Sequence, residues 1–121
     1  MSLPVAVQVY SVRKDAEADF YGTLKKIKEM GYDGVEFAGL YGHSADEVKA
    51  MLDELGLKAM SAHVPFKELK DEQTFKKYAT FGMKYIAIPS LPDADRYEGG
   101  NFDKTITDIK KVGNMAKKYG M

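Results

Sequence analysis

The stretch that decides the fold is Leu24-Lys-Lys-Ile-Lys-Glu-Met-Gly-Tyr-Asp-Gly-Val-Glu-Phe-Ala38. Its first half has the apolar spacing of an amphipathic helix, Gly31 follows that helix, and a short apolar strand ends at Glu36. Glycine is favoured directly after a helix because the chain takes a left-handed conformation there, in which a side chain would clash. The stretch therefore predicts a helix that stops at a glycine and reverses into a strand.

The same order of helix, glycine and strand recurs along the chain. After Gly56 the sequence continues as Lys58-Ala-Met-Ser-Ala-His-Val64, and after Gly82 it continues as Tyr85-Ile-Ala-Ile-Pro89. A strand with alternating valines over Val5–Tyr10 precedes the first helix, and a fourth helix closes the sequence. Strands joined by helices run parallel through right-handed crossovers. The sequence thus predicts four strand–helix units.

The sequence also predicts where the helices begin and where the loops lie. Four residues of helix-capping type precede the apolar stripes, namely Asp19, Ser44, Asp71 and Asn101. The stripe of the first helix is Phe20, Leu24, Ile27 and Met30. Ser44 and Glu47 have the spacing of a capping box. Ser11–Asp15 is predicted to be a polar loop, and Ser90–Gly100 is the longest connection.

A sheet of four parallel strands is incomplete by itself. The 121 residues suffice for one domain, residues 1–121, whereas a (β/α)8 barrel needs about 250. Half a barrel leaves two open strand edges and a concave apolar face. We therefore predict an α/β fold, a (β/α)4 half of a TIM (β/α)8 barrel with parallel strands and outer helices. Because Gly120-Met121 repeats Gly82-Met83, we expect a fifth strand in a longer polypeptide, or a second copy as partner.

The composition excludes several classes of partner. Lys and Arg together number 18, as do Asp and Glu, so the formal net charge is zero. This balance predicts no nucleic-acid partner and no anionic membrane surface, and no apolar run has membrane-spanning length. The sequence contains no cysteine, which excludes a disulfide framework and fits a cytoplasmic location.

In a barrel of this type, functional side chains lie at the carboxyl ends of the strands. The residues at these predicted ends are Gln8, Tyr10, Glu36, His63 and Ser90. Glu36 stands in an apolar strand, so its carboxylate either pairs with a lysine or arginine at the barrel rim or acts on a ligand. His63 is either a packed, hydrogen-bonded residue or a metal ligand or proton carrier. His43, directly before a predicted cap, is expected to be an exposed loop residue.

Three segments that contain these residues resemble the corresponding segments of the xylose-isomerase-like TIM barrels. They are Gln8-Val-Tyr-Ser-Val-Arg13, Gly31-Tyr-Asp-Gly-Val-Glu-Phe37 and Ser61-Ala-His63. The family includes sugar and sugar-phosphate isomerases and epimerases, and the resemblance covers the whole chain as the N-terminal half of such a barrel. It implies a metal-dependent proton transfer next to a carbonyl of a small sugar substrate.

The resemblance also implies a division of roles between the two halves. A divalent metal ion (Mn, Mg, Zn or Co) is expected in the complete barrel, where the family's usual ligands lie on strands five to eight. No metal ligand, no catalytic residue and no activity are therefore expected in this chain alone. Glu36 and His63 match family positions that line the substrate pocket from the opposite wall, and we expect substrate contact from both and from Tyr10.

Two other interpretations remain. The DNA-acting endonuclease IV branch of the family resembles this chain less, because it has a histidine where the fourth strand here ends in Ile88-Pro89-Ser90. Clustered Lys or Arg for phosphate contacts are also absent from this neutral sequence. The alternative of another class is a non-catalytic half barrel that self-associates as a binding or scaffold module.

Overall fold

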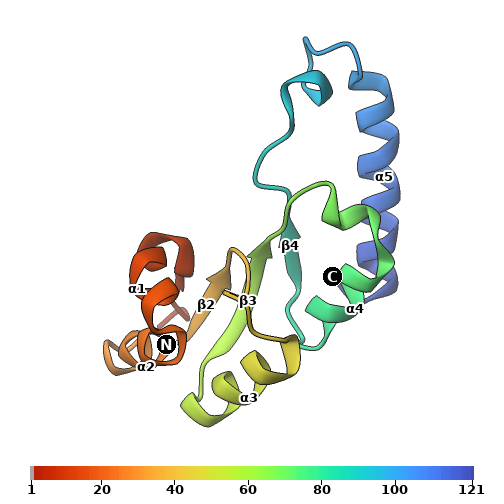
Figure 1. Cartoon of the computed structure of the whole chain (residues 1–121). Coiled ribbons are helices and arrows are strands. Elements are labelled where there is room, and N and C mark those ends of the chain that lie inside the picture. The colour runs from red at the N-terminus through yellow and green to blue at the C-terminus, as the bar shows by residue number, and fades with distance from the viewer. Residues whose placement is uncertain (1) are drawn as a thin grey trace.

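A parallel sheet of four strands organises the chain, and the computed structural model describes residues 2–121 of it (Figure 1). The strands are β1 (Ala6–Gln8), β2 (Gly34–Phe37), β3 (Lys58–His63) and β4 (Tyr85–Ala87). The α-helices are α1 (Arg13–Ala18), α2 (Phe20–Glu29), α3 (Ala45–Leu55), α4 (Glu72–Ala79) and α5 (Phe102–Lys118). Three short 3-10 helices are η1 (Val9–Val12), η2 (Glu68–Lys70) and η3 (Asp93–Asp95).

The strands lie in sequence order, β1-β2-β3-β4, and every neighbouring pair is parallel. This confirms the predicted α/β fold class, in which parallel strands alternate with helices. A parallel sheet in sequence order brings the carboxyl ends of all strands to one edge. Side chains at these strand ends are therefore the candidates for a functional site.

The predicted helix ends and most of the predicted caps are confirmed. A glycine with positive φ follows each of four helices, at Gly31, Gly56, Gly82 and Gly120. Asp19 accepts a hydrogen bond from the backbone of Gly22 at 2.9 Å, and Asp71 accepts one from Gln73 at 2.9 Å. The capping box of α3 is complete, because the backbone of Ser44 donates to Glu47 and the backbone of Glu47 donates to the Ser44 hydroxyl.

Three local predictions were wrong. Ser11–Asp15 is helical, as parts of η1 and α1, although it has no long apolar stripe; Ala16, the residue of α1 that is buried in the core, directly follows it. Asn101 begins α5 without a side-chain cap, since its amide donates to Asp95 at 3.4 Å instead. Met30 is 69% exposed, because it lies at the C-cap of α2, after the last helical turn.

The core lies between the helices and one face of the sheet. Val35, Phe37 and Val64 point to this face and are fully buried. The ring of Phe37 lies 6.3 Å from that of Phe20 and 5.5 Å from that of Phe81, measured between centroids. Side chains alternate between the two faces of a strand, so Glu36 and His63 belong to the opposite face.

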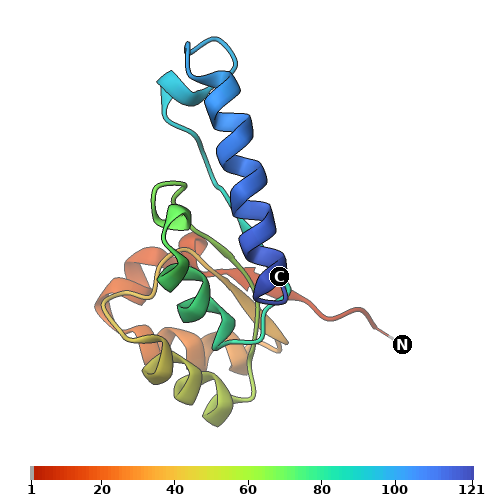
Figure 2. The ribbon, with the colours of Figure 1, turned by 90° about the vertical axis from the view of Figure 1, so that its right-hand side faces the viewer.

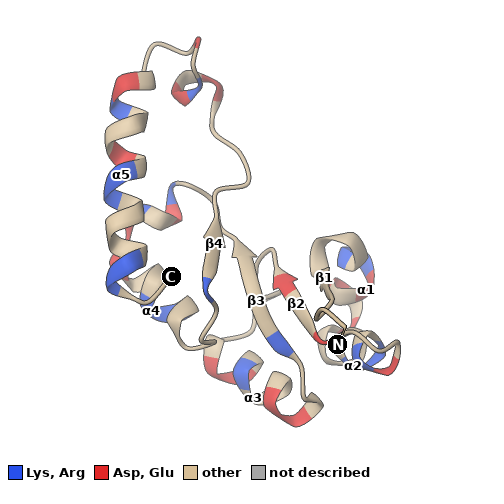
Figure 3. Cartoon of the chain, turned by 180° about the vertical axis from the view of Figure 1, so that it is seen from behind, with Lys and Arg blue, Asp and Glu red and all other residues tan. Residues whose placement is uncertain are grey.

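That opposite face of the sheet is open. Figure 3 shows β2, β3 and β4 with no helix of residues 2–121 in front of them. The side chain of Tyr85 on β4 is 71% exposed, which is unusual for a strand of a parallel sheet. Acidic and basic residues are interleaved along the outer helices (Figure 3).

Helix α5 has the smallest share of buried residues among the α-helices that the structure describes. Figure 2 shows its N-terminal part and the preceding loop standing beyond the rest of the chain. Within α5 only Thr105 and Ala116 are buried, and Ile106 is 38% exposed. The chain therefore has an uncovered sheet face and an incompletely covered last helix.

Candidate functional site

Four polar side chains meet on the open face of the sheet at the carboxyl ends of the strands. Gln8 ends β1, Glu36 lies in β2, and Ser61 and His63 belong to β3. The strand register brings them together, because Gln8 pairs with Glu36 across β1 and β2, and Glu36 pairs with Ser61 across β2 and β3. We call these four residues the strand-end cluster.

A β-bulge sets this register. Val35 pairs with Ala59 but the next residue of β2, Glu36, pairs with Ser61, so Met60 is the extra residue. Bulges re-aim side chains and are frequent at barrel rims and next to active sites. Without it Glu36 would face Met60 and would lose the hydroxyl that now binds its carboxylate.

Glu36 is the centre of the cluster. Its Oε1 accepts a hydrogen bond from Gln8 Nε2 at 2.6 Å and lies 3.3 Å from His63 Nε2. Its Oε2 accepts a short hydrogen bond from the hydroxyl of Ser61. The carboxylate is therefore paired, but with neutral donors and a histidine rather than with the lysine or arginine that the alternative reading of the sequence required.

These contacts keep Glu36 ionised. The hydrogen bond from Ser61 is the largest influence and lowers the pKa of Glu36 below its usual value, against the opposing effect of burial. Gln8 and His63 lower the pKa of Glu36 further. A carboxylate with a lowered pKa serves as a hydrogen-bond acceptor or a negative charge near neutral pH, and not as an acid.

Two of the three predicted substrate contacts, Tyr10 and His63, line the same depression. Gln8, Tyr10 and His63 line a cavity of about 430 Å³ beside Pro65 and Pro89. Glu36 is not among the lining residues, although 27% of its side chain is exposed next to Gln8 and His63. The cavity is concave and combines apolar walls with a few polar groups, as small-molecule sites do.

Tyr10 forms one wall of this cavity from η1. Its side chain is 52% exposed, and the guanidinium of Arg13 lies 4.3 Å from the centre of its ring. Arg13 also donates a hydrogen bond to the backbone oxygen of Tyr10 at 3.0 Å. Tyr10 was predicted to end the first strand, but β1 ends at Gln8, and the ring of Tyr10 lines the cavity from the helical turn η1 that follows.

Two further sequence candidates lie outside the cluster. Ser90 lines a different depression, beside Phe66 and Pro92. His43 is half-buried rather than exposed as predicted, because its ring stacks on Phe20 at 5.3 Å. Its Nδ1 lies 3.8 Å from Glu47 in the capping box of α3.

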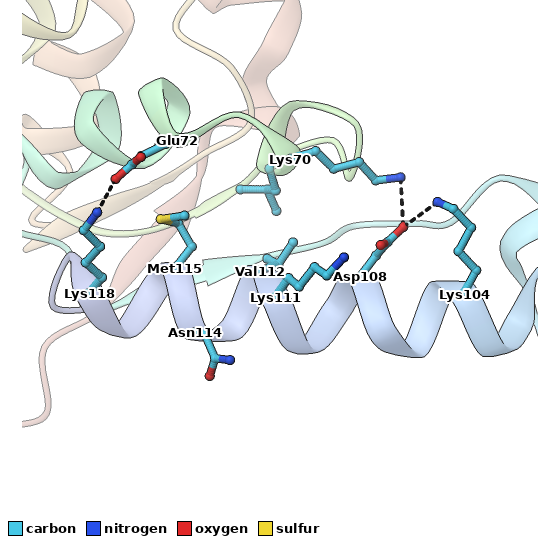
Figure 4. Close-up of a pocket in the computed structure, with 10 residues that line it drawn as sticks. Lys70, Glu72, Lys104, Asp108, Lys111, Val112, Asn114, Met115 and Lys118 are labelled. Carbon is cyan, nitrogen blue, oxygen red and sulfur yellow. Dashed lines mark hydrogen bonds and ion pairs between the residues drawn. The ribbon is translucent and has the colours of Figure 1, made fainter.

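A larger depression, of about 670 Å³, lies between α5 and the segment of η2 and α4 (Figure 4). Five of the six charged side chains that line it are paired with each other. Asp108 binds Lys104 at 2.9 Å and Lys70 at 3.3 Å, and Glu72 binds Lys118 at 2.5 Å. This groove lies on the helical side of the sheet, away from the strand-end cluster, and its ion pairs join α5 to its neighbours.

The cluster by itself supplies few groups that could bind a metal ion. Within residues 2–121 no group of three or more histidine, aspartate or glutamate side chains is arranged to hold an ion. Glu36 and His63 supply two such groups, whereas a catalytic zinc site has three protein ligands. In the same part of the chain, no helix has the length and apolarity needed to cross a membrane.

Comparison with known proteins identifies the fold. Neither the protein-family models nor the curated proteins compared with this sequence gave a match. A solved structure, that of a sugar phosphate isomerase/epimerase from Parabacteroides distasonis ATCC 8503, superposes with a TM-score of 0.70 at 18% sequence identity. The match covers 98% of this chain and 49% of that chain. The chain folds as half of a TIM barrel.

This match confirms the half barrel predicted from the sequence. The chain spans about half the length of the structure that it matches, and it does so over almost its own full length. The two uncovered surfaces, the concave sheet face and α5, are those that further strands and helices cover in a closed barrel. The strand-end cluster then lies at the mouth of the half barrel, where barrels carry their sites.

Proposed function

We propose that the half barrel is the N-terminal part of an enzyme that isomerises or epimerises a sugar or sugar phosphate by moving a proton next to a carbonyl. The observation that carries this proposal is the strand-end cluster at the carboxyl edge of a sheet that matches a sugar phosphate isomerase/epimerase. The site is incomplete without strands five to eight, so this chain alone is inactive.

In this proposal the half barrel orients the substrate. Glu36 accepts a hydrogen bond from a substrate hydroxyl, Tyr10 packs against the carbon chain, and His63 closes the wall between them. Support comes from the shared cavity of Tyr10 and His63 and from the ionised state of Glu36. An acceptor next to an aromatic ring suits a sugar, which is polar at its hydroxyls and apolar at its carbons.

In this proposal a divalent metal ion (Mn, Mg, Zn or Co) is bound by residues of the other half of the barrel. The described residues do not fit a metal ion, and we assign none of them as a ligand. When bound, such an ion polarises the carbonyl and hydroxyl oxygens of a sugar. The proton is moved by residues of the other half.

The test is turnover by a polypeptide that carries this chain together with the completing strands, on a panel of aldoses, ketoses and their phosphates. A buried hydrogen-bond partner left unpaired costs about 1–3 kcal/mol, so Glu36→Ala and His63→Ala are each expected to lower kcat/KM about 10- to 100-fold. Glu29→Ala is the matched control, because Glu29 is exposed at the end of α2. Unchanged turnover in both site variants would refute the site assignment.

A second candidate function is a self-associating binding or scaffold module. It is favoured by the open sheet face, where Tyr85 is 71% exposed, and by the free edges of β1 and β4. Two copies in which each β1 pairs with the other β4 would close an eight-stranded barrel. Light scattering that gives a monodisperse, cooperatively folded monomer would contradict this candidate.

A further inference from the structure

The cavity of Tyr10 and His63 also has lining residues that sequence analysis did not select. They are Glu68 of η2 and Lys77 and Tyr78 of α4. The volume of about 430 Å³ lies within the range of small-molecule pockets, about 300–1,000 Å³. A ligand in this cavity therefore meets side chains of η2 and α4 as well as those near the strand ends.

The hydroxyl of Tyr78 has no partner and opens to this cavity. Tyr78 is buried, with 2% of its surface exposed, yet within residues 2–121 its hydroxyl forms no hydrogen bond. Every side-chain nitrogen and oxygen in this part of the chain that is completely inaccessible has a hydrogen-bond partner. The small exposed fraction of Tyr78 therefore includes its oxygen, and the depression that Tyr78 lines is this cavity.

Packing alone does not account for this hydroxyl. A phenylalanine has the same ring and would fill the same place in the core, as Phe75 does one turn earlier on α4, with 0% of its surface exposed. Burying a hydroxyl without a partner costs free energy, whereas burying the bare ring does not carry that cost. A group in the cavity that bonds to the hydroxyl of Tyr78 would explain why a tyrosine is accommodated here.

The charges around the hydroxyl define the kind of group that fits. Burial, and then the negative charge of Glu68, raise the pKa of Tyr78 above its ordinary value, so the hydroxyl stays protonated. Lys77 Nζ lies 5.4 Å from the centre of the Tyr78 ring. Among residues 2–121, the lysine and the acidic residue that line the cavity are Lys77 and Glu68, so their charges balance. This balance favours an uncharged polar group over an anion.

We propose that Tyr78 is a substrate-binding residue whose hydroxyl bonds to an uncharged hydroxyl group of a sugar in this cavity. The proposal rests on the function proposed above, because the ligand is the sugar of that proposal. It adds a substrate contact that comes from a helix and not from a strand end. It also means that the phosphate of a sugar phosphate lies elsewhere in the complete barrel.

The test is equilibrium binding to the polypeptide that carries this chain together with the completing strands. Calorimetry is used with the aldoses, ketoses and phosphates of the panel above, and with the monodeoxy derivatives of each sugar that binds. Tyr78→Phe removes only the hydroxyl, and one hydrogen bond between uncharged groups contributes about fivefold to an equilibrium. We expect Tyr78→Phe to raise the Kd of the sugar about fivefold. For the monodeoxy derivative that lacks the contacting hydroxyl, the Kd should be the same in both proteins.

The stability of the same polypeptide separates ligand binding from a structural role. Because the hydroxyl of Tyr78 has no partner within residues 2–121, Tyr78→Phe should leave the urea midpoint of the ligand-free protein unchanged. Tyr119→Phe is the matched control, since the Tyr119 hydroxyl donates to Glu72 Oε1 at 2.7 Å. It should lower the midpoint and leave the Kd unchanged. A lowered midpoint in Tyr78→Phe would mean that the hydroxyl bonds to protein in the complete barrel, which would overturn the proposal.

The binding data also distinguish failure of this proposal from failure of the proposed function. A Kd that is equal in wild type and Tyr78→Phe for every bound sugar would overturn the role of Tyr78 and leave the isomerase or epimerase function standing. Binding that weakens in Tyr78→Phe, without turnover of any sugar, would remove the proposed function and keep the contact. Absence of binding by every sugar of the panel would overturn both.

Discussion

Replacement of Ser61 by alanine tests the electrostatics of the strand-end cluster. The change removes the hydroxyl that donates to Oε2 of Glu36 and leaves the bulge and the backbone pairing of β3 in place. Hydrogen bonds to charged groups contribute about 1.5–3 kcal/mol. Because 27% of the Glu36 side chain is exposed, water partly replaces the lost donor, and we expect a loss of about 1 kcal/mol near neutral pH.

The loss depends on pH in a defined direction. The pKa of Glu36 is lowered in the folded chain, chiefly by Ser61, so its ionised form stabilises the fold above the usual glutamate pKa. That contribution disappears as the pH falls through the lowered pKa of the folded state. The difference between Ser61→Ala and wild type is therefore expected at neutral pH and should shrink in acid.

Urea denaturation at several pH values measures this difference. With a slope of about 1–2 kcal/mol/M, a loss of about 1 kcal/mol lowers the midpoint by about 0.5–1 M at neutral pH. Ser11→Ala is the control, because Ser11 is an exposed residue of η1. A Ser61→Ala difference that is equal at neutral and acidic pH would show that the hydroxyl does not act through the charge of Glu36.

Three other substitutions test the fold around the site. Phe37→Ala removes a fully buried ring between Phe20 and Phe81, and we expect a loss of about 3–5 kcal/mol in chemical denaturation. Ser44→Ala breaks the capping box with Glu47 and should lower stability by about 1 kcal/mol; no change in the urea midpoint would argue against the cap. Asp108→Asn weakens the ion pairs that Asp108 makes with Lys70 and Lys104, and we expect faster hydrogen exchange in α5 than in wild type, with exchange in α3 unchanged.

The sequence predicted the architecture well because local signals and topology agree. A glycine with positive φ follows each of four helices, as the repeated pattern of helix, glycine and strand indicated. Asp19, Ser44 and Asp71 cap helices as expected, since each precedes an apolar stripe. Ser11–Asp15 was missed because the segment is short and has no apolar stripe, with Ala16 as the one buried residue of α1.

The site was predicted only in part. Glu36, His63 and Tyr10 stay predicted substrate contacts, and the structure shows only that Tyr10 and His63 line one cavity and that Glu36 lies next to His63. Ser61 was missed as a partner of Glu36 because its position depends on a β-bulge, for which the sequence of β3 gives no signal. Gln8 was noted as a strand end, but its two hydrogen bonds follow from the register of three strands and not from spacing along the chain.

The central claim is that this chain is one half of a barrel whose other half belongs to the same polypeptide. The direct test is the intact mass of the natural polypeptide that carries this sequence, with light scattering on the same sample. The account predicts a mass of about twice the 13.5 kDa of this chain, since the chain covers 49% of the structure that it matches. A mass of 13.5 kDa with a dimer in solution would instead favour two half barrels closed on each other. A mass of 13.5 kDa with a stable monomer would contradict both forms of the account.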